Sequence, residues 1–288
     1  MILVPGYWLT GDSFEPVTSA LAAAGHDAEG VTRQGATLAE QIAHLVALVD
    51  TVDEPVILVG HSAGGPICHG VVDARPTRVC HVIYVDTWPG SDGCAVNSGL
   101  PVVEGRIPLP DWQHFDSADL TDLTDDLRAH FADIAIPEPA AVDTDPLVLT
   151  NLARREVPID IIACEFSPEQ LRSWAHDGAE VLRELLTLQS VRYHHVPTGH
   201  WPQLTKPVEL AALIVDECLQ TSSVTFTNQN NSGGSDDSIN QVFALWVDGY
   251  RLARGDPSCS ESVIKNSTNC AWLILNAVVS DYLSLARH

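Results

Sequence analysis

The sequence predicts an α/β fold in which a mostly parallel sheet carries helices on both faces, and two observations support this prediction. The first is an alternation of short β-branched runs with longer helical patterns, which is typical of βαβ units. The second is the run Val56–Val59, followed at once by Gly60-His61-Ser62-Ala63-Gly64. A G-x-S-x-G turn joins a strand to a helix and lifts the serine above the edge of a sheet. The chain has 288 residues and is 45% hydrophobic, enough to bury a sizeable core.

Two periodicities define the expected elements. Short runs rich in Val and Ile predict strands at Ile2–Val4, Asp27–Val31, Val56–Val59, Arg78–Val85, Pro158–Ala163 and Val191–Val196. Apolar residues that recur with the helical period predict helices at Phe14–Ala24, Leu38–Val52, Ala63–Ala74, Pro168–Leu188 and Val208–Gln220. Parallel strands need such crossover helices between them, so the two sets of elements agree.

One segment, from about residue 88 to residue 156, interrupts the alternation. It is rich in Pro, Asp and isolated aromatic residues, with a short helical pattern at Ala118–Phe131. A connection of this length is typical of an inserted lid over a site. We therefore expect a core domain over residues 1–220 with a lid at 88–156. A flexible linker should follow at 221–238, and then a short helical C-terminal extension at 239–288, whose role the sequence does not disclose.

Composition excludes several classes of partner. A formal net charge of −23 repels phosphate backbones and anionic lipid, which argues against nucleic-acid and membrane partners. The seven cysteines form no C-x-x-C pair and resemble reduced, buried small side chains. The N-terminal run lacks a basic segment and is short, so we expect neither a signal peptide nor an anchor, and we predict a cytoplasmic protein.

The serine of the turn needs a base, because a hydroxyl is a weak nucleophile at neutral pH. His200 is the best candidate, since it lies in the loop between the last predicted strand and the last helix. His194 and His195 fall within a strand pattern, His61 lies inside the turn itself, and His176 lies on a helix. We therefore predict Ser62 as nucleophile and His200 as base.

These motifs make residues 1–220 resemble the α/β-hydrolase superfamily, in the small lidded group that includes esterases and lactonases. The resemblance rests on the turn Gly60–Gly65, on Gly199-His200-Trp201-Pro202 and on the chain order serine, acid, histidine. An oxyanion hole needs two backbone N–H groups. One comes from Ala63, which follows the nucleophile, and the resemblance implies Tyr7 as the second, with Trp8 as the nearest alternative. This sequence has Pro5 where the family has His.

The acid of the triad is open between two carboxylates. Most members of the superfamily place an aspartate after the penultimate strand, where this sequence reads Ala163-Cys164-Glu165-Phe166. Asp86 instead follows the strand after the nucleophile's helix, the position used by zearalenone-type lactonases and some haloalkane dehalogenases. We predict Asp86 as the acid, with Glu165 as the alternative.

A serine nucleophile favours acyl transfer to water over chemistry that requires a carboxylate nucleophile. The resemblance thus implies a carboxylic ester hydrolase for a small ester or lactone, with Trp8, Trp88, Trp112 and Trp201 as candidate substrate contacts. The alternatives are a cofactor-free lyase similar to hydroxynitrile lyases and a non-catalytic small-molecule binding or accessory protein. Neither a metal nor a cofactor is expected, and the oligomeric state stays open.

Overall fold

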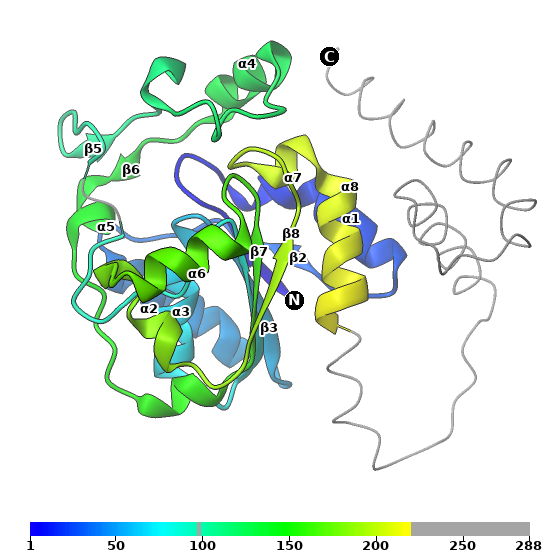
Figure 1. The fold of residues 1–288 in the computed structure, drawn as a ribbon, viewed down its shortest axis with the longest axis vertical. Helices are drawn as coiled ribbons and strands as arrows, with labels where there is room; N and C mark the ends of the chain where they lie inside the picture. The colour runs from blue at the N-terminus through cyan, green and yellow to red at the C-terminus, as the bar shows by residue number, and fades with distance from the viewer. Residues whose placement is uncertain (97–98, 220–288) are drawn as a thin grey trace, which may run out of the picture. The chain divides into compact units, whose positions relative to one another are not determined.

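The computed structural model describes residues 1–96 and 99–219, with side chains described up to residue 216. Its centre is a six-stranded, all-parallel sheet with strand order β2-β1-β3-β4-β7-β8 (Figure 1). The strands are β1 (Ile2–Val4), β2 (Glu29–Gly30), β3 (Val56–His61), β4 (Val79–Val85), β7 (Ile159–Ala163) and β8 (Val191–His195). Because all strands run the same way, the loops after them meet at one edge, where ligands bind in open α/β sheets.

Helices cover both faces of this sheet, as predicted. Figure 1 shows α1 (Glu15–Ala23) and α8 (Pro207–Leu213) side by side on one face. The other face carries α2 (Leu38–Thr51), α3 (Gly64–Ala74) and α6 (Pro168–His176). Each helix buries an apolar stripe: in α2, for example, Leu38, Leu45 and Val49 are buried. The last helix continues from α8 as a π-helical stretch, Ile214–Leu219.

The segment between β4 and β7 reaches from the top of Figure 1, where β5, β6 and α4 lie, down past α5, which contacts α2. It contains a two-stranded antiparallel ribbon, β5 (Arg106–Ile107) with β6 (Glu138–Pro139), and the helices α4 (Asp125–Ile134) and α5 (Ala140–Thr144). The 3₁₀ turn Trp112–His114 also belongs to this segment, and a second 3₁₀ turn near its end, Leu152–Glu156, packs against α3. We call residues 88–156 the lid.

Two predicted helices differ from the structure. The helix expected over Ala118–Phe131 starts only at Asp125, because the Thr124 side chain accepts a hydrogen bond from the Leu127 N–H and caps it there. The helix expected over Pro168–Leu188 ends at His176. Gly178, with φ of +89°, follows that end and is typical of a helix stop, and two 3₁₀ turns, Glu180–Leu182 and Glu184–Thr187, replace the rest.

Within the described residues, no helix is long and apolar enough to span a bilayer. The predicted linker at 221–238 and the predicted helical extension at 239–288 lie outside the described residues.

Candidate active site

Three loops at the carboxyl edge of the sheet contain residues with left-handed backbone. Trp8 after β1, Ser62 after β3 and Asp86 after β4 have φ of +65°, +52° and +48°. Non-glycine residues adopt this conformation at a cost, and such strained positions gather at functional sites because the surrounding packing maintains them. The central strands therefore present a serine and a carboxylate at adjacent positions.

The turn around Ser62 requires its glycines for steric reasons. A Cβ on Gly60 would lie 2.8 Å from the Gly64 carbonyl oxygen, and one on Gly64 would lie 2.3 Å from the Val4 carbonyl oxygen. Only glycine permits so close an approach of backbone to backbone. The serine is thereby placed at the start of α3 and stays partly exposed.

Ser62, His200 and Asp86 form a continuous hydrogen-bonded chain. The Ser62 hydroxyl lies 2.8 Å from His200 Nε2, and His200 Nδ1 lies 2.8 Å from Asp86 Oδ2. In this arrangement Nδ1–H donates to the carboxylate and Nε2 accepts the serine proton. The geometry is that of a nucleophile, its base and an orienting acid.

Backbone N–H groups hold the carboxylate of Asp86 in place. Its Oδ1 accepts from the Cys164 N–H at 2.7 Å and from the Glu165 N–H at 3.1 Å. These donors follow β7, where the resemblance placed the usual aspartate. Asp86 is buried, and within the described residues the hydrogen bond found for its other oxygen, Oδ2, is the one to His200.

The alternative acid, Glu165, also faces the histidine. Its Oε2 lies 3.3 Å from His200 Nδ1, compared with 2.8 Å for Asp86, and this oxygen is buried without a hydrogen-bond partner. The structure thus brings both predicted carboxylates to the same nitrogen. Asp86 is the closer one and the one fixed by donors.

The electrostatics of the site follow from this crowding. Burial by itself would lower the pKa of His200, but the carboxylates of Glu165 and Asp86 outweigh it and raise the pKa of the imidazole. Burial raises the pKa of the Asp86 carboxyl, against the opposing effect of His200. In the lid, burial and the neighbouring Glu165 carboxylate raise the pKa of Asp119 to about 6.

The loop that carries His200 is anchored from two sides. On the side of the Ser62 turn, His61 Nε2 donates to the His200 carbonyl at 2.6 Å, and Gln203 Nε2 donates to His61 Nδ1 at 3.1 Å. Burial lowers the pKa of His61, which is consistent with a neutral ring in this role. On the side of the lid, the His200 backbone N–H donates to the Asp119 carbonyl at 2.9 Å, so the lid contacts the loop of the base directly.

The two predicted oxyanion donors belong to residues next to Ser62. Ala63 precedes the first residue of α3, so its N–H is among those that no earlier helical carbonyl satisfies. A Cβ on Gly6 would lie 2.6 Å from Ser62 Cβ, which places the Gly6–Tyr7 peptide directly beside the nucleophile. Trp8, the alternative donor, directs its backbone carbonyl to the Ile136 N–H of the lid.

The candidate substrate tryptophans divide into two groups. Trp8 and Trp201 are 5% and 2% exposed and pack in an aromatic cluster whose other members are Trp112, Phe115 and Phe131. Trp88 is partly buried and packs against Phe166. Trp201 packs edge-on against the His200 ring at 5.2 Å, so this cluster supports the base from the lid side.

Ligand atoms of Asp86, Glu165 and His200 lie within 4.8 Å of one another, a spacing that also suits a cation. The detailed geometry favours a proton in this position. His200 Nδ1 lies at hydrogen-bond distance from Asp86, while the other ring nitrogen faces a hydroxyl donor.

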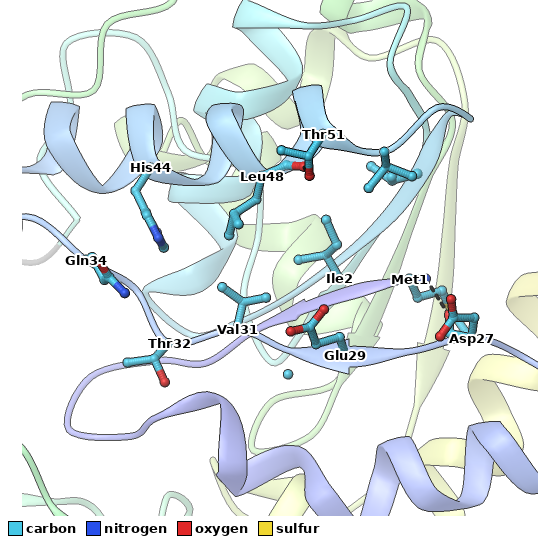
Figure 2. Close-up of a pocket in the computed structure, with 13 residues that line it drawn as sticks. Met1, Ile2, Asp27, Glu29, Val31, Thr32, Gln34, His44, Leu48 and Thr51 are labelled. Carbon is cyan, nitrogen blue, oxygen red and sulfur yellow. Dashed lines mark hydrogen bonds between the residues drawn. The ribbon is translucent and has the colours of Figure 1, made fainter.

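A pocket of about 340 Å³ lies along β2, the edge strand of the sheet (Figure 2). It is lined by the beginnings of β1 and β3, by β2 and by α2, including Met1, Glu29, His44 and Leu48. None of the three residues of the hydrogen-bonded chain lines it. It is therefore separate from the candidate active site.

Sequence reasoning missed several residues that the fold brings to the site. Asp119 in the lid, Gln203 after the His200 loop and Arg33 after β2 carry no local pattern that distinguishes them from other polar residues. Arg33 is 8% exposed, and it donates to the Gly6 carbonyl at 2.7 Å. Only the folded chain makes these neighbours visible.

A parallel sheet with a serine, a histidine and an aspartate at its carboxyl edge defines the class of α/β proteins that carry a Ser-His-Asp triad. The chain belongs to the alpha/beta hydrolase family, whose model matches residues 1–213. The fold and the resemblance predicted from the sequence are thus confirmed.

Individual relatives are distant. The chain is 34% identical over 77 residues to lipase LipV from Mycobacterium tuberculosis, covering 26% of this chain and 28% of that one. It is 29% identical over 112 residues to a carbendazim hydrolyzing esterase from a Nocardioides species, covering 35% and 46%. The chain therefore matches less than half the length of either of these two curated relatives.

Solved structures share the fold over nearly their whole length. An extracellular alpha/beta-hydrolase from a Paenibacillus species superposes with a TM-score of 0.60 at 21% identity, covering 74% of this chain and 96% of that one. A pyrethroid hydrolase from Sphingobium faniae gives a TM-score of 0.55 at 17% identity, covering 75% and 95%. At these identities the likeness extends to the fold alone.

Proposed function

We propose that this protein is a serine hydrolase that cleaves a small ester or lactone through an acyl-enzyme on Ser62. The observation that carries the proposal is the unbroken chain from the Ser62 hydroxyl through His200 to Asp86, with both links at 2.8 Å. Such a chain converts a weak hydroxyl nucleophile into one that attacks a carbonyl carbon.

In the acylation half, Ser62 Oγ attacks the carbonyl carbon while its proton moves to His200 Nε2. Asp86 stabilises the resulting imidazolium through Nδ1–H, and the Ala63 and Tyr7 N–H groups bind the oxygen that becomes negative. Collapse of the tetrahedral intermediate breaks the bond to the leaving alcohol, which takes the proton from Nε2. In a lactone, this alcohol stays attached to the acyl group.

In the deacylation half, water takes the place of the alcohol. His200 Nε2 accepts a proton from water as its oxygen attacks the acyl carbon, and the same N–H groups bind the oxyanion again. Return of the proton to Ser62 Oγ releases the carboxylic acid and restores the starting state. Each step uses side chains and backbone of this chain together with water.

The substrate class has further support. Both curated relatives carry ester-cleaving names, an esterase and a lipase, and a structural neighbour is called a pyrethroid hydrolase. The partly buried Trp88 and Trp112 lie in the lid next to the loops of the triad, which suits a hydrophobic or aromatic acyl part. The lactonase activity and the cytoplasmic location stay predictions.

Burst kinetics with a series of p-nitrophenyl esters test the proposal. We expect rapid release of about one nitrophenolate per active site, followed by slower turnover, and an intact-mass increase equal to one acyl group. The Ser62→Ala variant should give neither. Cleavage of a hydroxynitrile without any ester turnover would instead favour the lyase alternative, and tight binding without turnover would favour the binding-protein alternative.

A further inference from the structure

The loop after β1 is attached to the lid by a buried arginine that belongs to neither. Arg33 Nη2 donates to the Gly6 carbonyl at 2.7 Å, and both terminal nitrogens of Arg33 contact the carboxylate of Glu138 in β6. The Arg33 side chain is 2% exposed and that of Glu138 is 10% exposed. This contact is therefore shielded from water, where charge-assisted hydrogen bonds are strong.

The Gly6 carbonyl matters because it shares a peptide unit with the Tyr7 N–H. The described chain contains no cis peptide bond, so the carbonyl and the N–H of this unit point in opposite directions. When Arg33 holds the carbonyl on one side, the N–H must face the other side. A Cβ on Gly6 would lie 3.1 Å from Ser62 Oγ, so this peptide borders the nucleophile.

The arginine is itself fixed in one orientation. Besides Glu138, the guanidinium donates to Gln41 Oε1 in α2 at 2.7 Å, and it lies over the Tyr7 ring at 5.8 Å. A planar guanidinium with several donors can satisfy a carbonyl, an amide and a carboxylate at once. Lysine, with a single ammonium group, could replace only part of this set.

The same loop is attached to the lid at other points. The Tyr7 hydroxyl donates to Asp143 in α5 at 2.9 Å, and Trp8 Nε1 donates to the Ile107 carbonyl in β5 at 3.1 Å. These contacts hold the side chains of the loop, whereas Arg33 holds the peptide that precedes Tyr7. Rotation of that peptide would present a carbonyl oxygen to the developing oxyanion in place of a donor.

We propose that Arg33, held by Glu138 of the lid, is a positioning residue that keeps the Tyr7 N–H directed into the oxyanion hole. The inference rests on the proposed function, because it assigns a role within the same reaction. The contacts found for Arg33 are to Gln41, Glu138, the Gly6 carbonyl and the Tyr7 ring, so it acts on the site through the Gly6–Tyr7 peptide. The lid would thus help to form the catalytic machinery in addition to covering it.

The test compares Arg33→Met with Arg154→Met. Arg154 is a matched control, since its side chain is 3% exposed and it pairs with the buried carboxylates of Asp73 and Glu184, away from the triad. Each variant loses the buried ion pairing of its arginine, one carboxylate for Arg33 and two for Arg154, so the control should lose at least as much stability. For Arg33→Met we expect kcat to fall about 10²-fold, near the loss for one oxyanion donor, with KM changed little. For Arg154→Met we expect kcat per folded molecule to stay within about twofold of wild type.

A ligand pair separates positioning from a merely structural role. A trifluoromethyl ketone forms a hemiketal oxyanion on Ser62, whereas the matching methyl ketone binds as a ground-state analogue. Arg33→Met should weaken binding of the first far more than binding of the second, and Arg33→Lys should restore part of the difference. If Arg33→Met does not fold, Glu138→Gln provides a milder variant with the same expected direction.

Three outcomes would overturn the inference: equal kcat losses for the two arginine variants, equal weakening of both ketones, or an unchanged Gly6–Tyr7 peptide in a crystal structure of Arg33→Met. The crystal structure decides the positioning role even if the wild-type protein hydrolyses no ester. In that case the proposed function fails, while the orientation of the peptide still shows whether Arg33 controls it.

Discussion

Replacing Asp86 by asparagine should disable the histidine in a way that the local geometry dictates. Oδ1 of Asp86 accepts from two backbone N–H groups, at 2.7 and 3.1 Å. An asparagine must place its carbonyl oxygen there, because its NH₂ group cannot accept those donors. The NH₂ group then faces His200 Nδ1 and favours the tautomer protonated on Nε2. That tautomer cannot take the proton of Ser62.

The expected loss of kcat is about 10³–10⁴-fold, the effect of a wrong tautomer combined with an unstabilised imidazolium. This corresponds to about 4–5.5 kcal/mol of transition-state stabilisation. Glu165→Gln should cost less than about tenfold, because Glu165 lies 3.3 Å from Nδ1 and Asp86 keeps its position in that variant.

The assay is steady-state hydrolysis of a p-nitrophenyl ester by the two variants, with thermal unfolding to establish that each is folded. Asp160→Asn is a suitable control, because Asp160 is buried and accepts from His194 at 2.6 Å without contact to the triad. Its kcat should stay near that of wild type. A reversed ranking of Asp86→Asn and Glu165→Gln would assign the acid to Glu165, and equal mild losses would mean that neither carboxylate orients His200.

Further predictions concern the nucleophile, the base and the turn. Ser62→Ala should lower kcat for ester hydrolysis by several orders of magnitude while the protein stays folded. A kcat within about tenfold of wild type would contradict the mechanism. Catalysis needs neutral His200, and the pKa of His200 is raised, so kcat/KM should fall as the pH drops through a value above the usual imidazole range. Glu165→Gln should move this fall to lower pH, because it removes one of the carboxylates that raise the pKa. A pH profile that does not move would contradict this cause. The protonated form of His200 is favoured in the fold, so its contribution to stability should be present at acidic pH and be lost as the pH rises through the raised pKa. Gly64→Ala should lower the free energy of unfolding, measured by denaturant titration, by about 1–3 kcal/mol or more, because its Cβ would lie 2.3 Å from a backbone carbonyl oxygen. Gly25→Ala is the control: its φ is +84°, no atom lies within 4 Å of the new Cβ, and the free energy of unfolding should fall by only about 1 kcal/mol.

Local patterns in the sequence were sufficient for the fold class and for the expectation that Ser62 and His200 lie at the same edge of the sheet, where the structure brings them together. The alternation of strands and helices reflects periodicities that each segment carries by itself, and the sheet confirms it. The turn around Ser62 was recognisable because close backbone contact at Gly60 and Gly64 excludes any side chain. His200 could be predicted because the loop after the last strand lies at the same edge of the sheet as the serine.

Helix ends were predicted less well, because capping depends on single side chains and on one glycine. The early stop of α6 follows from Gly178, and the late start of α4 follows from the Thr124 cap. Both signals are present in the sequence. They compete there with helical periodicity, and the packing of the neighbouring segments decides between them.

The tertiary structure alone decided the relation between the two candidate acids. Asp86 and Glu165 follow different strands, and the pairing of Val85 with Ile162 brings the two strand ends together so that both carboxylates reach His200. Register is a property of two strands at once, so neither strand's sequence contains it.

The contact of Arg33 with the Gly6 carbonyl likewise joins two loops and the lid, segments that are far apart along the chain. The sequence by itself determined the fold class and two of the side chains on which the proposed chemistry rests, because Ser62 and His200 stand in recognisable local patterns. Only the folded chain decided which groups orient that chemistry, because orientation depends on contacts between segments that carry no common pattern.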